Sequence, residues 1–501
     1  MAVVLFAVLF YFCLTLTGEN SAGLLDERIY FKKDSVALNL VWICAALCCL
    51  YFVGKLSGIF QTAFSRNILC AVVCVSVTAI GIWWMHSTET TPQSDQMMVS
   101  YFADCFNSGD YSSLARGGYV ALLPYQLGLI TLLRVLYKIF GAGNYQSFQY
   151  LVIFSLSLLI ISGSRIVRIL SNDNVKAEIY YLLAMLLCFP MYAYTIFVYG
   201  DLISTVLVFF GMWMYLDCLK SFSWVKMIFF GLSVGAAVQL REVMKIFVVA
   251  LVITGIIKLL SERKRCHFIM LASLAGGLIL GQAAIWWIYR DIRPKDADSI
   301  PAALVVVMGL DDEGERSGWF NRYHYDTFES LDYDAELSKQ KAYEDLEGYL
   351  SRYREDPAYM LDFFKRKMTA QWEAPMYQSI AMNSYVTGEQ SPLIHDIFNH
   401  GRVAGVIEKE MKIYQLLLYG GILFWLIAKR KETVRIEKYT FLIAVFGGFW
   451  FSLIWEAKTR YILPYFIMMI PYLAMGISEI TLLPGKWAKK YIKTKKQQQD
   501  G

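Results

Sequence analysis

The stretch NILCAVVCVSVTAIGIWWM, residues 67–85, is followed at once by HSTETTPQSD, residues 86–95. The first stretch carries no charge and is long enough to cross a bilayer, which takes about 20 residues of apolar helix. The second stretch is polar and ends in the carboxylate of Asp95. The pattern indicates a membrane span that delivers an acidic side chain to the start of a polar loop.

Similar apolar runs occur along most of the 501 residues, of which 57% are hydrophobic and 18% charged, with a mean hydropathy of +0.43. Soluble domains carry about 25% charged residues. Because lipid offers the backbone no hydrogen-bond partners, the spans must be helices. We predict an all-α polytopic membrane protein with about twelve spans. They fall near 2–17, 36–54, 67–85, 146–164, 178–198, 202–219, 224–240, 243–260, 267–288, 412–428, 439–455 and 461–482.

The orientation of these spans follows from the Lys and Arg residues of the short loops, which concentrate on the cytoplasmic side. If twelve spans alternate, these residues all fall on one side, and both termini are cytoplasmic. The loops 86–145 and 289–411 then lie outside, and Cys105 is the one cysteine in them, which excludes a disulfide framework there. The chain has no Asn-x-Ser/Thr sequon, which favours a bacterial membrane protein. The basic residues are Arg165, Arg168, Lys176, Lys220, Lys226, those of 263–265 and 429–438, and those of the tail 486–501.

These boundaries divide the chain into five parts. Two additional spans occupy 1–66, a transmembrane core occupies 67–288 with the first external loop at 86–145, an external region occupies 289–411, further spans occupy 412–485, and a basic cytoplasmic tail occupies 486–501.

Two external stretches have helical patterns. Residues 119–140 are apolar but contain Arg134 and Lys138, which are costly inside lipid, so we predict a helix lying along the outer surface. Residues 334–370 repeat apolar side chains at near-helical spacing and are interrupted by Pro357. The second external region is therefore predicted to be mostly helical.

Ionisable residues at the outer ends of the spans are few, and charges at such depth favour a functional site. Each also has a structural interpretation: Arg241 with Glu242, or Glu456 with Arg460, could pair and close a hairpin, and Asp201 could be a helix cap. His86 and His324 are interpreted as surface residues. Phosphate-loop, nucleophile-elbow and zinc-protease motifs are absent from the sequence. The residues concerned are Asp95, Asp104, Asp201, Arg241, Glu242, Lys245, Glu456, Lys458 and Arg460.

Three short motifs accompany the early loop acid. They are Pro124-Tyr-Gln-Leu-Gly128, Tyr137-Lys-Ile-Phe-Gly141 and Glu456-Ala-Lys-Thr-Arg-Tyr-Ile-Leu-Pro464. From about residue 67 onward, the chain resembles the type C membrane glycosyltransferases, the superfamily of protein O-mannosyltransferases, aminoarabinose transferases and oligosaccharyltransferases.

The resemblance implies a polyprenyl-phosphate-linked sugar donor, an extracytoplasmic acceptor such as a cell-wall or surface polysaccharide, teichoic acid or glycolipid, and reaction on the outer face. The position that matches the family's general base is Asp95. The candidates for binding the donor phosphate are Arg460, Arg241 and Lys245. The resemblance implies no nucleic-acid partner.

The chain departs from the family's pattern at the second acid, because Gln93 and Ser94 precede Asp95 where many members have an adjacent carboxylate. The possible second acids are Asp104, Asp201 and Glu456. A divalent cation, Mg²⁺ or Mn²⁺, is possible, and Asp95, Asp201 and Glu373 would hold it if the fold brought them together.

Other residues of the second external region have two interpretations each. The trio Lys365-Arg-Lys367 is expected to lie on lipid headgroups, with a lipid phosphate as the alternative. Sugar stacking and interfacial anchoring are equally compatible with Trp319, Tyr323, Tyr325 and Trp372. The rival functions are a lipid-linked saccharide transporter or flippase, which should show paired half-repeats, and an O-antigen-type polymerase or ligase.

Overall fold

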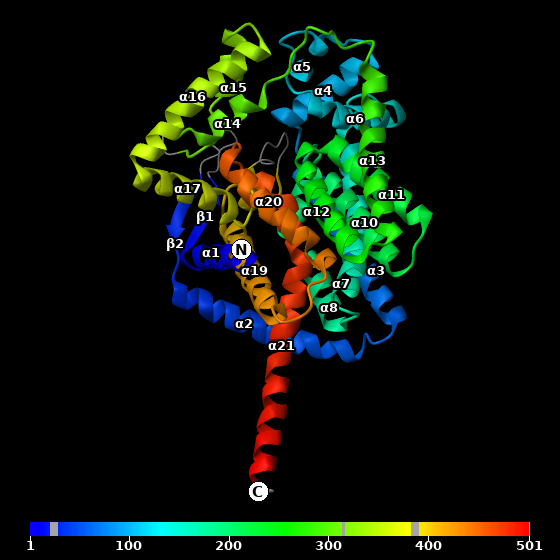
Figure 1. The fold of residues 1–501 in the computed structure, drawn as a ribbon, viewed down its shortest axis with the longest axis vertical. Coiled ribbons are helices and arrows are strands. Elements are labelled where there is room, and N and C mark those ends of the chain that lie inside the picture. The colour runs from blue at the N-terminus through cyan, green and yellow to red at the C-terminus, as the bar shows by residue number, and fades with distance from the viewer. Residues whose placement is uncertain (21–28, 313–315, 382–389, 500–501) are drawn as a thin grey trace.

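The structure, a computed structural model, describes residues 1–20, 29–312, 316–381 and 390–499. These residues form an α-helical polytopic membrane protein whose long helices run side by side, while α21 extends away from the body at one end (Figure 1). The strands described are β1 (Leu16–Asn20) and β2 (Ile29–Lys33), which pair antiparallel.

Within the described residues, nine helical stretches are long and apolar enough to cross a membrane, or up to eleven if each bent pair is one span. Each predicted span overlaps at least one helix, and the all-α polytopic prediction is confirmed. The nine stretches are Val36–Gly58 (with α2, Val36–Lys55), α3 (Ala63–Thr88), α7 (Tyr145–Leu170), α10 (Asp201–Lys220), Glu242–Glu262 (with α12, Lys245–Glu262), α13 (Arg265–Tyr289), α19 (Arg402–Lys429), Ile436–Ile454 (with α20, Thr440–Ile454) and Thr459–Pro484 (the start of α21, Leu463–Gln499). A bent pair joins α8 (Val175–Leu186) to α9 (Phe189–Ala193) at 49°, and α11 (Trp224–Leu240) is a shorter apolar helix.

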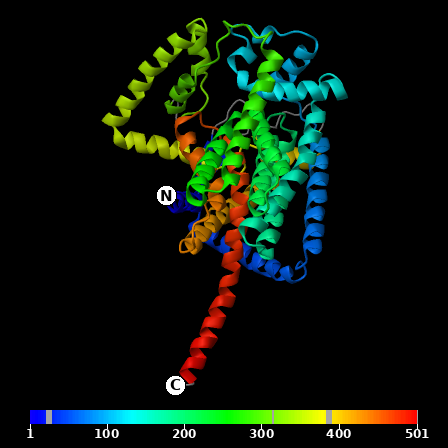
Figure 2. The same cartoon turned by 45° about the vertical axis from the view of Figure 1, so that its right-hand side comes forward.

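The N-terminal part differs from the long bundle helices. Helix α1 (Ala2–Thr15) has 14 residues and is therefore about 21 Å long, shorter than the roughly 30 Å hydrocarbon core. The chain leaves it as a strand at Leu16, inside the predicted span 2–17. Helix α2 runs across the ends of the bundle, as Figures 1 and 2 show. If neither α1 nor α2 crosses the membrane, the number of spans falls by two. The predicted orientation of the remaining spans is then unchanged.

The apolar stretch 119–140 is broken into α5 (Tyr119–Leu122) and α6 (Leu127–Phe140), with a bend of 99° between the two arms of the helix pair. The Arg134 guanidinium donates to the hydroxyl of Tyr289 at 3.1 Å. It also donates to the carbonyl of Phe106 at 3.3 Å, and Phe106 lies at the end of α4 (Asp95–Asn107). Arg134, whose charge argued against a lipid-facing span, thus has hydrogen-bond partners within the protein.

The second external region is helical, as predicted. Asp334 caps α16 (Ala335–Glu355) by accepting from two backbone amides, each at 2.9 Å, and α17 begins at Pro357 after α16 ends. Proline suits the first turn of a helix because the amide it lacks would be unpaired there. The helices are α14 (Ala302–Leu310), α15 (Tyr323–Ser330), α16, α17 (Pro357–Trp372) and α18 (Pro392–Phe398).

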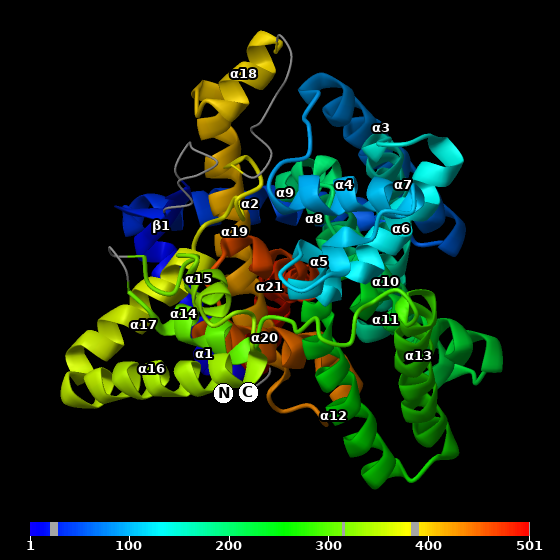
Figure 3. The same ribbon diagram turned by 90° about the horizontal axis from the view of Figure 1, so that it is seen from above.

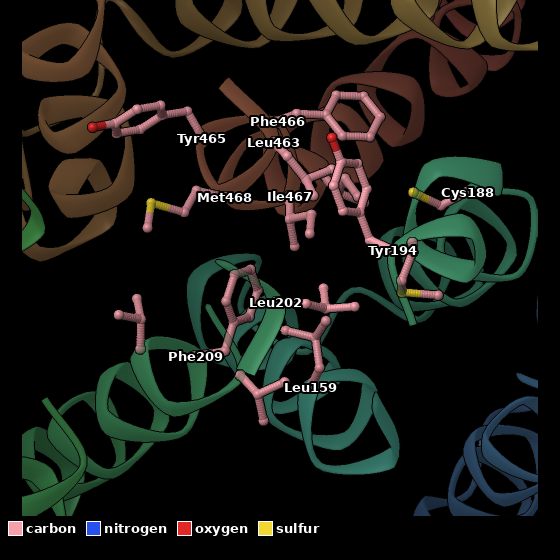
Figure 4. Packing of buried hydrophobic residues seen from close by; sticks show 14 of the residues in the cluster. Leu159, Cys188, Tyr194, Leu202, Phe209, Leu463, Tyr465, Phe466, Ile467 and Met468 are labelled. Carbon is pink, nitrogen blue, oxygen red and sulfur yellow. The ribbon is translucent and has the colours of Figure 1, made fainter. Parts of the chain in front are cut away.

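The core lies where α21 packs between the two halves of the bundle. Phe209 of α10 and Leu159 of α7 face Ile467 and Met468 of α21, and all four side chains are fully buried (Figure 4). The first turns of α21 follow directly after Arg460, so this packing fixes the position of the 455–462 segment.

Helix α17 joins the external region to the membrane bundle through the end of α20. The ammonium of Lys367 donates to the carbonyls of Gly309 and of Trp455, the latter at 2.7 Å. The Gln371 amide donates to the Ser452 carbonyl at 3.0 Å, and the Thr459 hydroxyl donates to the Ala370 carbonyl at 2.9 Å. Two of these bonds, to the carbonyls of Trp455 and Ser452, satisfy acceptors that the end of α20 leaves without helical partners.

The basic trio 365–367 is therefore not a headgroup patch as a unit. Lys367 is fully buried, and Arg366 forms two hydrogen bonds to the Asp312 carboxylate, at 3.0 and 2.8 Å. The prediction was wrong for these two residues because α17 turns this face towards protein instead of lipid. Lys365 is exposed.

Burial lowers the pKa of Lys367 to about 7. An unfolded lysine titrates near 10.4, so between pH 7 and 10 the unfolded state binds one proton more than the folded state, and stability rises with pH. Lys367→Met should lack this rise and should lose about 1–3 kcal/mol for each carbonyl left without a donor. Unfolding in mixed detergent micelles at pH 7 and pH 9.5 measures both effects. The exposed control Lys365→Met should behave like the wild type, and the same pH dependence in Lys367→Met would contradict the assignment.

Candidate active site

A cavity of about 1430 Å³ opens between the bundle and the external region. Its wall comes from the start of α4, the α5–α6 bend, the α11–α12 hairpin, the segment after α13, the start of α15 and the 451–465 segment. Seen from above in Figure 3, α5, α14, α15 and α20 lie close together near the middle of the molecule. Asp95, Arg241, Lys245, Glu456 and Lys458 are among the residues that line the cavity.

Asp95 is the first residue of α4 and follows Ser94, whose φ is +54°. Its Oδ1 accepts a hydrogen bond from the Tyr119 hydroxyl at 3.2 Å. Among the described residues, no cation pairs with this carboxylate, which leaves it available to a ligand in the cavity.

The neighbouring residue, Gln96, fixes Asp95 relative to the hairpin before α10. The Gln96 side-chain oxygen accepts from the backbone amide of Val198 at 2.8 Å, and Gln126 of the α5–α6 bend donates to the Tyr199 hydroxyl. Two amide side chains therefore align the first external loop with the 197–201 hairpin: Gln126, which belongs to the 124–128 motif, and Gln96, which was not singled out from the sequence.

Arg241 lies at the cavity wall and pairs with Asp201, with 2.9 Å between Nε and Oδ1. Its guanidinium lies 4.8 Å from the ring centroid of Tyr199 and 5.3 Å from that of Tyr461. Its two Nη groups make no hydrogen bond to the described residues, so they can bind an anion. The alternative pairing of Arg241 with Glu242 is not found, because Glu242 bonds Lys245 instead.

Arg460 lies behind this wall and is only 2% exposed. Its guanidinium stacks on Phe197, Tyr199 and Tyr461 at 5.1 to 5.5 Å. Its Nε has no hydrogen-bond acceptor among the described residues, and the Asp201 Oδ2 has no donor among them. Arg460 shares two rings with Arg241, so it adds positive potential to the wall without lining the cavity itself.

The possible second acids have different surroundings. Asp104 accepts from the backbone amide of Gly143 at 3.0 Å and is outside the cavity wall, and Asp201 is engaged by Arg241. Glu456 lines the cavity, accepts from Tyr461 at 2.9 Å and lies 3.5 Å from Lys458. It does not pair with Arg460, because residues 456–458 are not helical and the i, i+4 geometry is absent.

The proposed metal ligands do not meet. Within the described residues, no three His, Cys, Asp or Glu side chains are grouped so as to hold a metal ion. Asp95 faces the cavity, Asp201 pairs with Arg241, and Glu373 is buried, which raises its pKa. The residues present therefore do not fit a metal centre built from this trio.

The aromatic candidates divide into two pairs. Trp319 and Tyr325 line the cavity. Tyr323 instead donates to Asp345 at 2.5 Å, and Trp372 is fully buried and bonds Ser452 at 3.1 Å. Trp372 neither stacks on a sugar nor anchors at the membrane interface, because α17 carries it into the protein interior.

His324 was predicted to be a surface residue, but it is 7% exposed and lines the cavity. Its Nδ1 lies 3.1 Å from the Met308 sulfur. Burial, with a smaller effect of Lys458, lowers the pKa of His324 to about 4, so the imidazole is neutral at pH 7. No signal in the sequence marks this position, since its burial depends on how α14 and α15 pack.

Comparison with known proteins gives no match to a family model or to a curated protein. Matches to solved structures exist at low identity. They include two archaeal oligosaccharyltransferase structures and one structure of ArnT.

The Archaeoglobus fulgidus oligosaccharyltransferase in its apo form is 10% identical with a TM-score of 0.46, over 86% of this chain and 52% of that one. Archaeal oligosaccharyltransferase AglB from Archaeoglobus fulgidus, solved with an inhibitory peptide and a dolichol-phosphate, is 10% identical with a TM-score of 0.45, over 86% and 51%. ArnT from Cupriavidus metallidurans, bound to undecaprenyl phosphate, is 14% identical with a TM-score of 0.36, over 83% and 78%. The chain thus spans about half the length of the archaeal oligosaccharyltransferases that it matches.

The double substitution Asp201→Asn/Arg241→Gln tests whether the cavity wall binds phosphate. Removing both members of the pair avoids an uncompensated buried carboxylate, which would destabilise the fold. We expect a folded protein that binds undecaprenyl phosphate more than about tenfold more weakly, because the guanidinium fork is lost. Binding to the purified protein in nanodiscs measures this. Unchanged affinity would remove Arg241 from the anion site.

Proposed function

We propose that this protein is a membrane glycosyltransferase that moves a sugar from a polyprenyl-phosphate donor to an extracytoplasmic saccharide or glycolipid acceptor. The observation that carries the proposal is the placement of Asp95 and Arg241 on the wall of one cavity. A carboxylate without a cationic partner can take a proton, and a guanidinium with free Nη groups can hold an anion.

In the proposed reaction, the oxygen of the acceptor hydroxyl attacks the anomeric carbon of the donor sugar. The hydroxyl proton passes to the Asp95 carboxylate at the same time. The bond between that carbon and the phosphate oxygen breaks, and its electron pair leaves with the polyprenyl phosphate. Attack opposite the leaving group inverts the anomeric carbon. A general base of this kind contributes about 10²–10⁴-fold to the rate.

The leaving group departs as an anion, so its charge needs stabilisation more than it needs a proton. Arg241 presents its Nη groups for this purpose, and Lys245 lies on the same hairpin and the same cavity wall. Arg460 raises the positive potential from behind the two shared tyrosine rings. Glu456, which lines the cavity beside Tyr461, is proposed to orient the acceptor.

The proposed location of the reaction is the extracytoplasmic face, with both termini in the cytoplasm. This location is supported by the Lys and Arg residues of the short loops, which the charge rule places in the cytoplasm on the same side as the basic tail. The cavity-forming segments gather at the end of the molecule opposite that tail (Figure 1).

Asp95→Asn tests the function. In nanodiscs supplied with a panel of undecaprenyl-phosphate sugars and candidate acceptors, we expect sugar transfer to fall by about 10²–10⁴-fold, because the amide cannot accept the proton. Binding of undecaprenyl phosphate should be retained. Asp110→Asn, an exposed acid of the same loop, should transfer at the wild-type rate. Normal transfer by a well-folded Asp95→Asn protein would exclude Asp95 as the base.

A further inference from the structure

The segment 290–301, which we name the strap, links the end of α13 to the start of α14. It has no helix or strand, and most of its residues line the cavity. The backbone amide of Ile300 donates to the Leu122 carbonyl at 3.2 Å, which ties the strap to the first external loop. In Figure 3 the strap crosses from α13 to α14. It therefore forms one wall of the cavity, built from a part of the chain separate from the α11–α12 hairpin.

Three cations of the strap, Arg290, Arg293 and Lys295, line the cavity. Arg290 has its own carboxylate, Asp291, at 3.2 Å. Arg293 makes only a long hydrogen bond of 3.4 Å to the Ala297 carbonyl, and Lys295 has no ion pair within the described residues. The strap holds two further acids: Asp298 accepts from the Ala335 amide at 3.3 Å, and Asp296 is not among the residues that line the cavity. Arg293 and Lys295 thus bring positive charge into the cavity and have no carboxylate partner in the part of the chain that the structure describes.

The donor phosphate does not account for this charge. It is already served by Arg241 and Lys245 on a different wall, and a polyprenyl monophosphate carries a single anionic group. The cavity is also larger than one small ligand needs, since pockets for such ligands measure about 300–1,000 Å³ and this one measures about 1430 Å³. The cavity has room for a second ligand, and Arg293 and Lys295 of the strap are the cations available to it on this wall.

We propose that Arg293 and Lys295 bind a phosphate or carboxylate group of the acceptor, so that the acceptor is an anionic saccharide chain. The proposal rests on the proposed function and names its acceptor class. The Arg293 guanidinium can hold either group in a bidentate manner, and Lys295 adds a point charge beside it. Both side chains are solvent-accessible, so the attraction is screened by salt and speeds capture of the chain.

The test is binding to the full-length protein in nanodiscs of zwitterionic lipid. Three soluble probes are compared: an oligo(glycerol phosphate), an oligogalacturonate and a neutral maltooligosaccharide. The wild type should bind at least one anionic chain and should not bind the neutral one. Arg293→Gln/Lys295→Gln should weaken that binding by roughly tenfold and reduce its salt dependence. Comparing the two anionic probes tells phosphate from carboxylate.

The matched control is Lys339→Gln/Lys341→Gln, which removes the same charge from exposed positions of α16. It should bind the anionic probe like the wild type. Equal binding of all three probes by the wild type, or an equal loss in both double variants, would overturn the proposal. So would a strap variant altered only in its binding to vesicles containing phosphatidylglycerol, since the strap would then be a headgroup contact.

Undecaprenyl phosphate binding is measured on the same samples and separates this proposal from the proposed function. The strap variant should bind that lipid as the wild type does. Failure of the wild type to bind the lipid contradicts the proposed function, whereas failure to prefer the anionic chains contradicts the acceptor assignment. A strap variant that loses the lipid places Arg293 and Lys295 at the donor phosphate and overturns the acceptor assignment.

Discussion

The structure depends on how the end of α20 is satisfied. A helix leaves its last carbonyls without intrahelical donors, and α20 ends beside the cavity, where the chain turns into the non-helical residues 455–458. Lys367 and Gln371, one helical turn apart on α17, supply the donors. The amino group of Lys367 donates to the carbonyls of both Gly309 and Trp455. These bonds hold the external helices against the bundle and give the 455–462 segment a defined position, so Glu456 and Lys458 face the cavity while Arg460 packs behind it.

Charge pairing then determines which residues are available for chemistry. Asp201 engages Arg241 at Nε, Glu242 engages Lys245, and Glu456 engages Lys458. Asp95 differs, because its partner within the described residues is the neutral hydroxyl of Tyr119. The aromatic rings shared by Arg241 and Arg460 bring two guanidinium groups near each other where their repulsion would otherwise be large. An anion at the wall would relieve that repulsion, which is why the proposed phosphate site and the fold are compatible.

Much of the helical architecture could be predicted from the sequence, because runs of apolar residues and loop charges are local signals. The break at Pro357 was predictable for the same reason, whereas the 99° bend between the two arms of the 119–140 stretch was not predicted. The positions of Lys367, Trp372 and His324 were not, since each depends on packing between segments that are distant in the chain. The spacing of Glu456 and Arg460 was also misleading. Side chains four residues apart meet on a helix, and residues 456–458 do not form one. The candidates Asp95, Arg241, Lys245 and Arg460 came from motif resemblance and loop position. The structure was needed to show that Asp95, Arg241 and Lys245 line one cavity while Arg460 does not, and to show their partners.

The Gln96 side chain, which receives the Val198 amide, has a consequence for precision. Gln96 and Val198 lie far apart in the chain, at the start of α4 and just before α10, and Arg241 lies further on, between α11 and α12. Transfer between two bound molecules tolerates displacements of only about 1 Å. Gln96 fixes the start of α4 against the segment before α10, and Asp201, at the start of α10, pairs with Arg241. The relative position of the Asp95 carboxylate and the Arg241 guanidinium is therefore set by two side-chain contacts next to the cavity.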